Sequence, residues 1–234
     1  YIIKSSRPLG YYYTNDHNND LNNSYRAEEE VFAAYGMLDL NFSENWRMVA
    51  GARIENSYIN TENKVNEEAS TYKSGELEET DILPSLNVKY TVQEDMNLRL
   101  ALSRTLARPI FKEIGTSYYD YKSGFYVYGN PDLKRALIDN LDLRWEYFFD
   151  RGEKLAVSTF YKSFQNPIEQ KLLVETQNYE IVYVNSKDAY LYGAELEFRK
   201  NLGFVDLLSN FYLGGNITYV KSAVQIPKDV LEDI

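Results

Sequence analysis

Residues 98–109 read LRLALSRTLARP, and apolar residues occupy every second position at the start of this stretch. Successive side chains of a β-strand point to opposite faces, so Leu98, Leu100 and Leu102 share one face. Arg104 and Arg108 follow on the face of the leucines. The stretch therefore predicts a β-strand with one apolar face that ends in positive charge.

The same period of two recurs along the 234 residues of the chain. It predicts an all-β fold, an antiparallel meander of about eight strands. The predicted strands lie near 28–42, 46–60, 80–91, 96–107, 140–149, 154–164, 189–200 and 210–222. Short helices are predicted at 109–115, a stretch that begins with Pro109, and in the acidic tail at 227–234.

The connections between these strands alternate in length. The short turns are 43–45, 92–95 and 150–153, with a longer one at 201–209, and the long loops are 61–79, 108–139 and 165–188. Loops longer than about 12–15 residues are uncommon in compact soluble domains. Tight turns at one end and long loops at the other are typical of a transmembrane β-barrel of the outer membrane. Within the last long loop we expect 172–175 to pair with 181–184.

The two faces of the predicted strands differ in chemistry. One face is apolar, with aromatic residues near the short turns and a second aromatic group at the far ends (Phe42, Trp46, Tyr90, Tyr147, Phe149, Phe198 and Phe211; Tyr58, Tyr161, Tyr190 and Tyr219). Membrane barrels carry such aromatic girdles at both interfaces of the bilayer. The opposite face carries charges that we expect to form a salt-bridged network along a wet lumen (Arg53, Arg99, Arg144, Glu195, Glu197 and Arg199).

Composition excludes several classes of function. The net charge of −10 disfavours a nucleic-acid partner, because phosphate binding needs a basic surface. The chain has no cysteine, one histidine (His17) and no Gly-x-Ser-x-Gly motif, so we expect no enzyme, no metal and no cofactor. The 22 tyrosines favour surfaces with one apolar and one wet side. The start YIIKSSRPLG has no initiator methionine, and we interpret residues 1–234 as a single piece of a longer protein.

Two groups of residues are candidates for contacts outside the chain. Arg104 and Arg108 are expected to face the outer leaflet, where they contact lipopolysaccharide phosphates or extend to water. The loop SYYDYKSGFYVYG supplies six aromatic candidates for ligand contact (Tyr118, Tyr119, Tyr121, Phe125, Tyr126 and Tyr128). Two interpretations of this loop remain open: a gate that contacts the ligand, or a β-hairpin extension whose aromatic residues contact each other.

Four stretches of the sequence resemble the barrel of TonB-dependent outer-membrane receptors, particularly the Bacteroidota branch. They are DILPSLNVKYTVQEDMNLRLALSRTLARPIFKEI, GNPDLKRALIDNLDLRWEYFF, KLAVSTFYKSFQNPIE and YGAELEF. The motif residues are Arg104, Arg108 and Pro109, then Gly129, Asn130, Pro131 and Leu133, then Phe160, Tyr161, Pro167, Ile168 and Glu169, in that order. The resemblance covers roughly residues 28–223.

The resemblance implies a protein of the Gram-negative outer membrane that imports a scarce nutrient such as a siderophore, cobalamin or a glycan. Such barrels have about 22 strands around a plug, so this chain would supply wall and extracellular loops, without the plug. Its partners would be membrane lipid, lipopolysaccharide, TonB through the absent plug, and a surface lipoprotein. Two other functions remain open: a small closed barrel that serves as an anchor or adhesin, and a soluble all-β module that binds carbohydrate.

Overall fold

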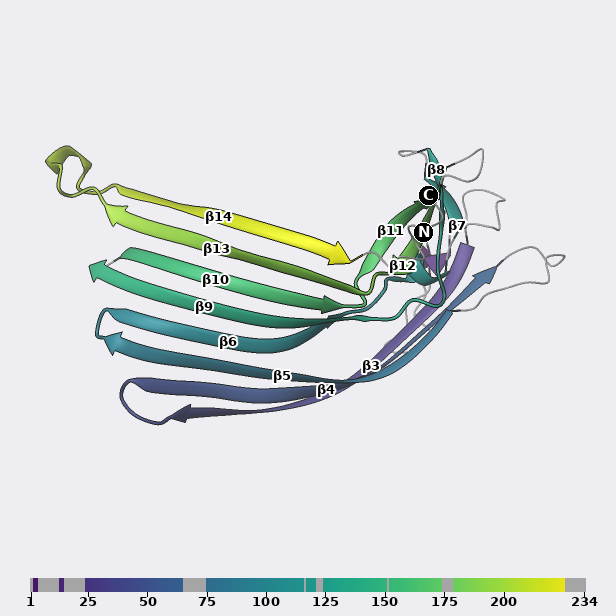
Figure 1. Ribbon diagram of the computed structural model, residues 1–234, viewed down its shortest axis with the longest axis horizontal. Helices are drawn as coiled ribbons and strands as arrows, with labels where there is room; N and C mark the ends of the chain where they lie inside the picture. Colours follow the sequence, from purple (N-terminus) through teal and green to yellow (C-terminus); the bar gives the residue numbers. More distant parts are fainter. Residues whose placement is uncertain are drawn as a thin grey trace.

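An eight-stranded antiparallel sheet dominates the computed structural model, which describes residues 2–3, 13–14, 24–64, 75–115, 117–120, 124–150, 152–173 and 179–225 (Figure 1). In chain order its strands are β3 (Ser24–Asn41), β4 (Trp46–Lys64), β5 (Gly75–Gln93), β6 (Met96–Ala107), β9 (Ala136–Asp150), β10 (Glu153–Gln165), β13 (Asp188–Asn201) and β14 (Tyr212–Gln225). Their spatial order is β14-β13-β10-β9-β6-β5-β4-β3, so each strand lies beside its neighbours in this series. This arrangement confirms the predicted all-β meander.

The boundaries of the strands agree closely with the sequence pattern. β6 spans the predicted range of 96–107, whereas β3, β4 and β5 extend further toward the long loops than expected. The extension arises because Ser24 pairs with Lys64 and Thr61 pairs with Gly75, far beyond the last apolar residue of the alternation. Backbone hydrogen bonding continues a hairpin even where side chains no longer alternate, and the sequence pattern does not record it.

The register places residues of similar polarity on the same face of all eight strands. One row of successive Cα partners is apolar apart from a threonine: Leu40, Met48, Val88, Leu100, Leu143, Thr159, Ala194 and Tyr219. The neighbouring row on the other side is polar throughout: Asn41, Arg47, Lys89, Arg99, Arg144, Ser158, Glu195 and Thr218. We call these two sides of the sheet the apolar face and the charged face.

The eight-stranded sheet is open. β3 and β14 form its two edges, and no ladder among the described residues joins them (Figure 1). A closed barrel requires the first and last strands to pair, because closure is what removes the edges of a sheet. The small closed barrel that the sequence left open is therefore wrong for this structure.

A second sheet lies at the end of the molecule opposite the short turns (Figure 1). It consists of β11 (Ile168–Leu173), β12 (Glu180–Asn185), β8 (Phe125–Tyr128) and β7 (Ser117–Asp120), in the order β11-β12-β8-β7, and we call it the loop sheet. β12 and β8 run parallel and join two long loops. Leu172 pairs with Ile181, so the expected strand extension is present, but residues 182–184 pair with 169–171 and not with 173–175, of which 174–175 lie outside the described residues.

Three shorter features complete the described residues. The helix α1 (Phe111–Gly115) confirms the predicted helix at 109–115, and a 3₁₀ helix η2 (Asp206–Leu208) lies between β13 and β14. A two-residue pair joins β1 (Ile2–Ile3) to β2 (Tyr13–Thr14). The predicted helix at 227–234 lies outside the described residues. Among the helices that are described, none has the length and hydrophobicity needed to span a bilayer.

Candidate functional site

A chain of ion pairs crosses the charged face. Arg99 of β6 contacts Glu146 at 2.8 Å, and Glu146 also contacts Arg144 at 2.9 Å. Arg144 reaches Glu197 of β13 at 2.8 Å, and Glu197 also contacts Lys154 of β10 at 2.6 Å. Guanidinium groups suit this arrangement because their forked donors can serve two carboxylates at once. This series of ion pairs links the strands of the charged face through alternating positive and negative side chains.

The residues expected in the lumen network have different partners. Arg99, Arg144 and Glu197 belong to the chain of ion pairs, while Arg53 contacts Glu55 at 2.5 Å. The ion pairs found among the described residues do not include Glu195 or Arg199. Arg199 instead stacks on the ring of Tyr212, with 4.8 Å between its guanidinium carbon and the ring centroid. That this face lines a lumen stays a prediction.

The segment 108–135 is fastened to the charged face at both of its ends. It leaves the sheet after Ala107 and returns at Ala136, and these two residues are Cα partners. At one end, Arg108 Nη2 contacts Glu55 Oε2 at 2.5 Å. At the other end, Arg135 Nη2 contacts Asp81 Oδ1 at 2.5 Å, and the Asp81 side chain is only 3% exposed.

Glu55 and Asp81 are themselves Cα partners on β4 and β5, so both anchors meet at one place. Arg135 also lies 3.6 Å from Glu79. Two polar atoms of this cluster, Asp81 Oδ2 and Arg108 Nε, are buried and have no hydrogen-bond partner in the structure. The cluster holds the segment 108–135 over the part of β4 and β5 that lies toward the long loops.

The position of Arg108 corrects the sequence prediction. Its guanidinium group contacts Glu55 on the charged face and does not lie on the apolar face with the leucines. The reason is that β6 ends at Ala107, so the alternation of a strand no longer determines where Arg108 points.

Arg104 does lie on the apolar face, but it has a protein partner that the sequence analysis missed. Its Nε and Nη2 donate to Asp139 Oδ1 and Oδ2 at 2.7 and 2.9 Å. Arg104 and Asp139 are Cα partners on β6 and β9, so the ladder register brings them together. Contact of Arg104 with lipopolysaccharide stays a prediction.

The helix α1 packs directly against the ends of β4 and β5 that lie toward the long loops. Ile114 is buried, and a Cβ atom added to Gly75 would collide with its Cγ2 atom. A Cβ atom on Gly115 would lie 2.7 Å from Cβ of the fully buried Thr61. The missing side chains of these glycines therefore allow the helix to approach the sheet closely.

The loop sheet has a small core of its own. Val127, Leu133 and Tyr183 form a buried cluster, against which Ile168 and Ile181 pack. Val127 belongs to β8, Ile168 to β11, and Ile181 and Tyr183 to β12, while Leu133 lies in the segment between β8 and β9. This core joins the two long loops that the sequence analysis treated separately.

Asparagine side chains also tie these loops together. Asn130 Nδ2 donates to the carbonyl oxygen of Tyr183 at 2.9 Å. The Asn185 side chain accepts from Lys134 N at 2.7 Å and donates to Lys134 O at 2.9 Å. Asn130 and Leu133 belong to the Gly-Asn-Pro-x-Leu motif, which therefore has a structural role here: the asparagine bonds one loop to the other and the leucine fills their shared core.

The aromatic candidates that the structure describes lie in the hairpin formed by β7 and β8. Phe125 makes an edge contact with Tyr179 at 5.7 Å between ring centroids, and the rings of Tyr126 and Tyr128 stack at 6.5 Å. The backbones of Tyr118 and Tyr119 pair with β8, and Tyr121 lies outside the described residues. The hairpin itself is thus present, while ligand contact stays a prediction.

Tyr128 is the residue of this hairpin whose ionisation is most clearly affected. Burial, followed by the nearby carboxylate of Glu180, raises the pKa of Tyr128 above its ordinary value. The shift extends to higher pH the range in which the Tyr128 hydroxyl is protonated and available as a hydrogen-bond donor.

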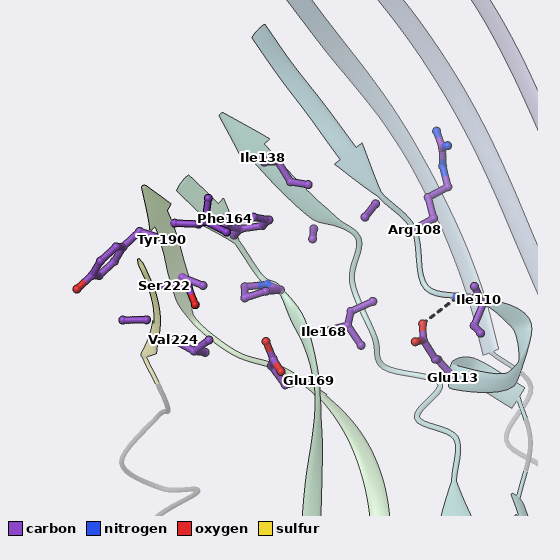
Figure 2. A pocket seen from close by; sticks show the side chains of 16 residues that line it. Arg108, Ile110, Glu113, Ile138, Phe164, Ile168, Glu169, Tyr190, Ser222 and Val224 are labelled. Carbon is purple, nitrogen blue, oxygen red and sulfur yellow. Dashed lines mark hydrogen bonds between the residues drawn. The ribbon is translucent and has the colours of Figure 1, made fainter. Parts of the chain in front are cut away.

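A pocket of about 460 Å³ opens between the sheet and the loop region (Figure 2). Its apolar part includes a row of Cα partners on the charged face, Ile138, Phe164, Ala189 and Val224. Polar groups at its margin include Arg108, Glu113 and Glu169 (Figure 2). Glu113 accepts a hydrogen bond from Ile110 N at 2.9 Å and so completes the first turn of α1.

The pocket could enclose an apolar group next to a charged margin. Groups of three or more His, Asp or Glu side chains arranged to hold a metal do not occur in the part of the chain that the structure describes. The pocket is not visible in the sequence, because its walls come from strands that are far apart in the sequence.

A long-stranded antiparallel sheet with one apolar face, one charged face and its long loops at one end is the architecture of a membrane-barrel wall. Residues 3–233 match the family model described as TonB dependent receptor-like, beta-barrel, and the chain belongs to this family. No curated protein matches the chain significantly.

Solved structures of receptors have a similar fold. The copper transporter OprC is 16% identical, with a TM-score of 0.65 over 85% of this chain and 30% of that chain. The ferric-catecholate import receptor Fiu from E. coli K12 is 12% identical, with a TM-score of 0.60 over 87% of this chain and 29% of that chain. The siderophore receptor PirA from Pseudomonas aeruginosa is 17% identical, with a TM-score of 0.56 over 86% of this chain and 44% of that chain. The chain thus spans less than half the length of each.

Proposed function

We propose that this chain forms part of the barrel wall and extracellular loops of a TonB-dependent transporter in the outer membrane of a Gram-negative bacterium. The apolar face contacts lipid, the charged face borders the aqueous interior, and the loop sheet lies on the cell-surface side. The observation that carries this proposal is the separation of apolar and polar rows across all eight strands.

The exposure of the apolar face supports contact with hydrocarbon. Leu143, in the middle of the apolar row, is 49% exposed, and Ile54, Ile82 and Ile217 are exposed on the same face. Contiguous apolar surface of this extent marks an interaction or membrane face in a folded protein. The charged face could not replace it there, because burying ion pairs in a dry environment costs several kcal/mol for each ion by order of magnitude.

Aromatic residues at the short-turn end support the position of the membrane interface. The rings of Trp46 and Tyr90 lie 4.5 Å apart, and those of Tyr147 and Phe149 lie 4.8 Å apart, at the base of neighbouring hairpins. Tyrosine and tryptophan prefer such interfaces because one end of the ring is apolar and the other is wet. The short turns would therefore face the periplasm.

The loop sheet and the pocket would form part of the entrance through which a scarce nutrient passes. The candidate classes are siderophores, cobalamin and glycans, and the hairpin aromatics Phe125, Tyr126 and Tyr128 are the proposed contacts. Energy would come from TonB through a plug domain, and a surface lipoprotein is a proposed partner, as in a receptor of the Bacteroidota type. Arg104 would face the lipopolysaccharide leaflet. The chain would have no enzymatic activity.

Cysteine accessibility in intact cells tests the proposed topology. The full-length protein carrying Tyr179→Cys, beside the loop sheet, should react with a membrane-impermeant maleimide added to whole cells. Glu44→Cys, in the short turn after β3, should react only after the outer membrane is permeabilised. The unsubstituted protein provides the background. Reaction of Glu44→Cys in intact cells, with Tyr179→Cys protected, would contradict the proposed orientation.

A further inference from the structure

The connection between β13 and β14 differs from the other turns at the same end of the sheet. The connections 42–45, 94–95 and 151–152 consist of polar residues and glycine apart from Phe42, whereas residues 202–211 read LGFVDLLSNF. Phe204 is 76% exposed, Leu207 is 87% exposed and Phe211 is 59% exposed. In Figure 1 this turn projects beyond the other three. A single turn thus presents several large apolar side chains.

Hydrogen bonds give this turn a defined shape. Leu202 N donates to Phe211 O at 2.9 Å, which closes the turn at its base. Val205 N donates to Leu202 O at 3.0 Å, and Leu208 N donates to Val205 O at 2.8 Å. Gly203 N donates to the Asn201 side chain at 2.6 Å. The apolar side chains are therefore exposed on a backbone whose polar groups are largely satisfied within the turn.

The exposed side chains stand on two successive turns of the backbone. The bond from Val205 N to Leu202 O closes a first turn that contains Phe204, and the bond from Leu208 N to Val205 O closes a second turn that contains Leu207. Val205 between them is extended and precedes η2. Phe204 and Leu207 are therefore both exposed at the tip of this connection. Asp206 carries the only charge within 202–211.

The turn continues the apolar face at its periplasmic margin. Phe198 and Leu213 lie on the apolar face at the last rungs of β13 and β14, where Phe198 pairs with Gly215 and Leu213 pairs with Lys200. Phe211 directly precedes β14 and is exposed at the same margin. The apolar surface thus continues from Leu213 through Phe211 into the turn, and the Lys200 side chain beside Leu213 contacts Glu153 at 2.6 Å.

We propose that this turn is a membrane-interface anchor, in which Phe204 and Leu207 insert between the lipid headgroups and acyl chains of the periplasmic leaflet. The inference rests on the proposed function, because it requires the apolar face to contact lipid. A lipid surface fits better than a protein partner, because the exposed side chains form a projecting tip that continues the lipid-facing belt. Amphipathic segments of peripheral proteins bind bilayers in the same way, by burying one apolar side at the boundary.

Fluorescence quenching by lipids tests this inference in the full-length protein reconstituted into phosphatidylethanolamine-rich vesicles. Residues 1–234 contain no cysteine, so Leu207→Cys gives a defined position within them for an environment-sensitive NBD label. Leu143→Cys provides the reference for the lipid-facing belt, and Glu44→Cys provides the reference for a polar turn. Leu207 is almost fully exposed, so its replacement removes few contacts within the chain.

We expect the label at 207 to emit at shorter wavelength than the label at 44. It should lose most of its emission when the vesicles contain lipid with a nitroxide near the headgroup. If the label at 143 is quenched by lipid but the label at 207 behaves like that at 44, the anchor is wrong and the proposed function stands. Quenching at neither 143 nor 207 would overturn the proposed function itself. A blue-shifted label at 207 that no lipid quencher reaches would show that protein covers the turn, which also overturns the anchor.

Discussion

Replacing Leu100 by arginine should destabilise the protein far more than the same change at Ala101. Leu100 belongs to the apolar row, whereas Ala101 points to the charged face, where its Cα partners are Asn87 and Asp142. Leu100 lies four residues after Met96, the first residue of β6. At about 3.4 Å per residue this places it about 14 Å along the strand.

The strand tilt converts this length into a depth. With a tilt of about 40° the height above the start of β6 is about 10 Å, close to the middle of an apolar band about 25 Å tall. An arginine on the lipid face at mid-bilayer costs about 2–4 kcal/mol. At position 101 the new guanidinium group would meet water and the carboxylate of Asp142, so we expect a change of less than about 1 kcal/mol.

The measurement is the free energy of unfolding of each full-length variant in lipid vesicles, from guanidinium titrations followed by tryptophan fluorescence. Both variants add the same side chain to adjacent residues of the same strand, so differences in strand propensity largely cancel. Equal losses at 100 and 101, or a greater loss at 101, would refute the assignment of the two faces.

Three further predictions concern the loop segment and its core. Arg135→Gln leaves the buried Asp81 without its partner and should weaken the attachment of 108–135 by about 3–5 kcal/mol, seen as faster proteolysis of that segment; Arg47→Gln, whose pair with Asp39 is exposed, should cost less than about 1 kcal/mol. Gly75→Ala forces its Cβ onto Ile114 and should cost about 1–3 kcal/mol, whereas Gly36→Ala meets no atom within 4 Å and should be neutral in the same thermal unfolding assay. Leu133→Ala removes a buried core side chain of the loop sheet and should cost about 2–5 kcal/mol, measured as faster amide exchange in β8 and β12, with the exposed Leu172→Ala as control. Equal effects within any of these matched pairs would contradict the corresponding contact.

The sequence by itself determined the strands and the chemistry of their faces. The alternation in LRLALSRTLA predicted β6 with its observed boundaries, and the apolar residues of the other strands lie on a common face of the sheet. This information is local, because the backbone of any strand sends successive side chains to opposite sides. The alternation of short turns and long loops was equally visible, since it depends only on where the alternating segments stop.

The tertiary structure alone decided which distant groups meet. Arg108 lies on the charged face because the strand ends one residue earlier, and Arg104 meets Asp139 because of the register between β6 and β9. The parallel pairing of β8 with β12 joins residues more than 50 positions apart. Such contacts depend on how segments far apart in the chain are placed against each other, and a pattern of neighbouring residues does not carry that information.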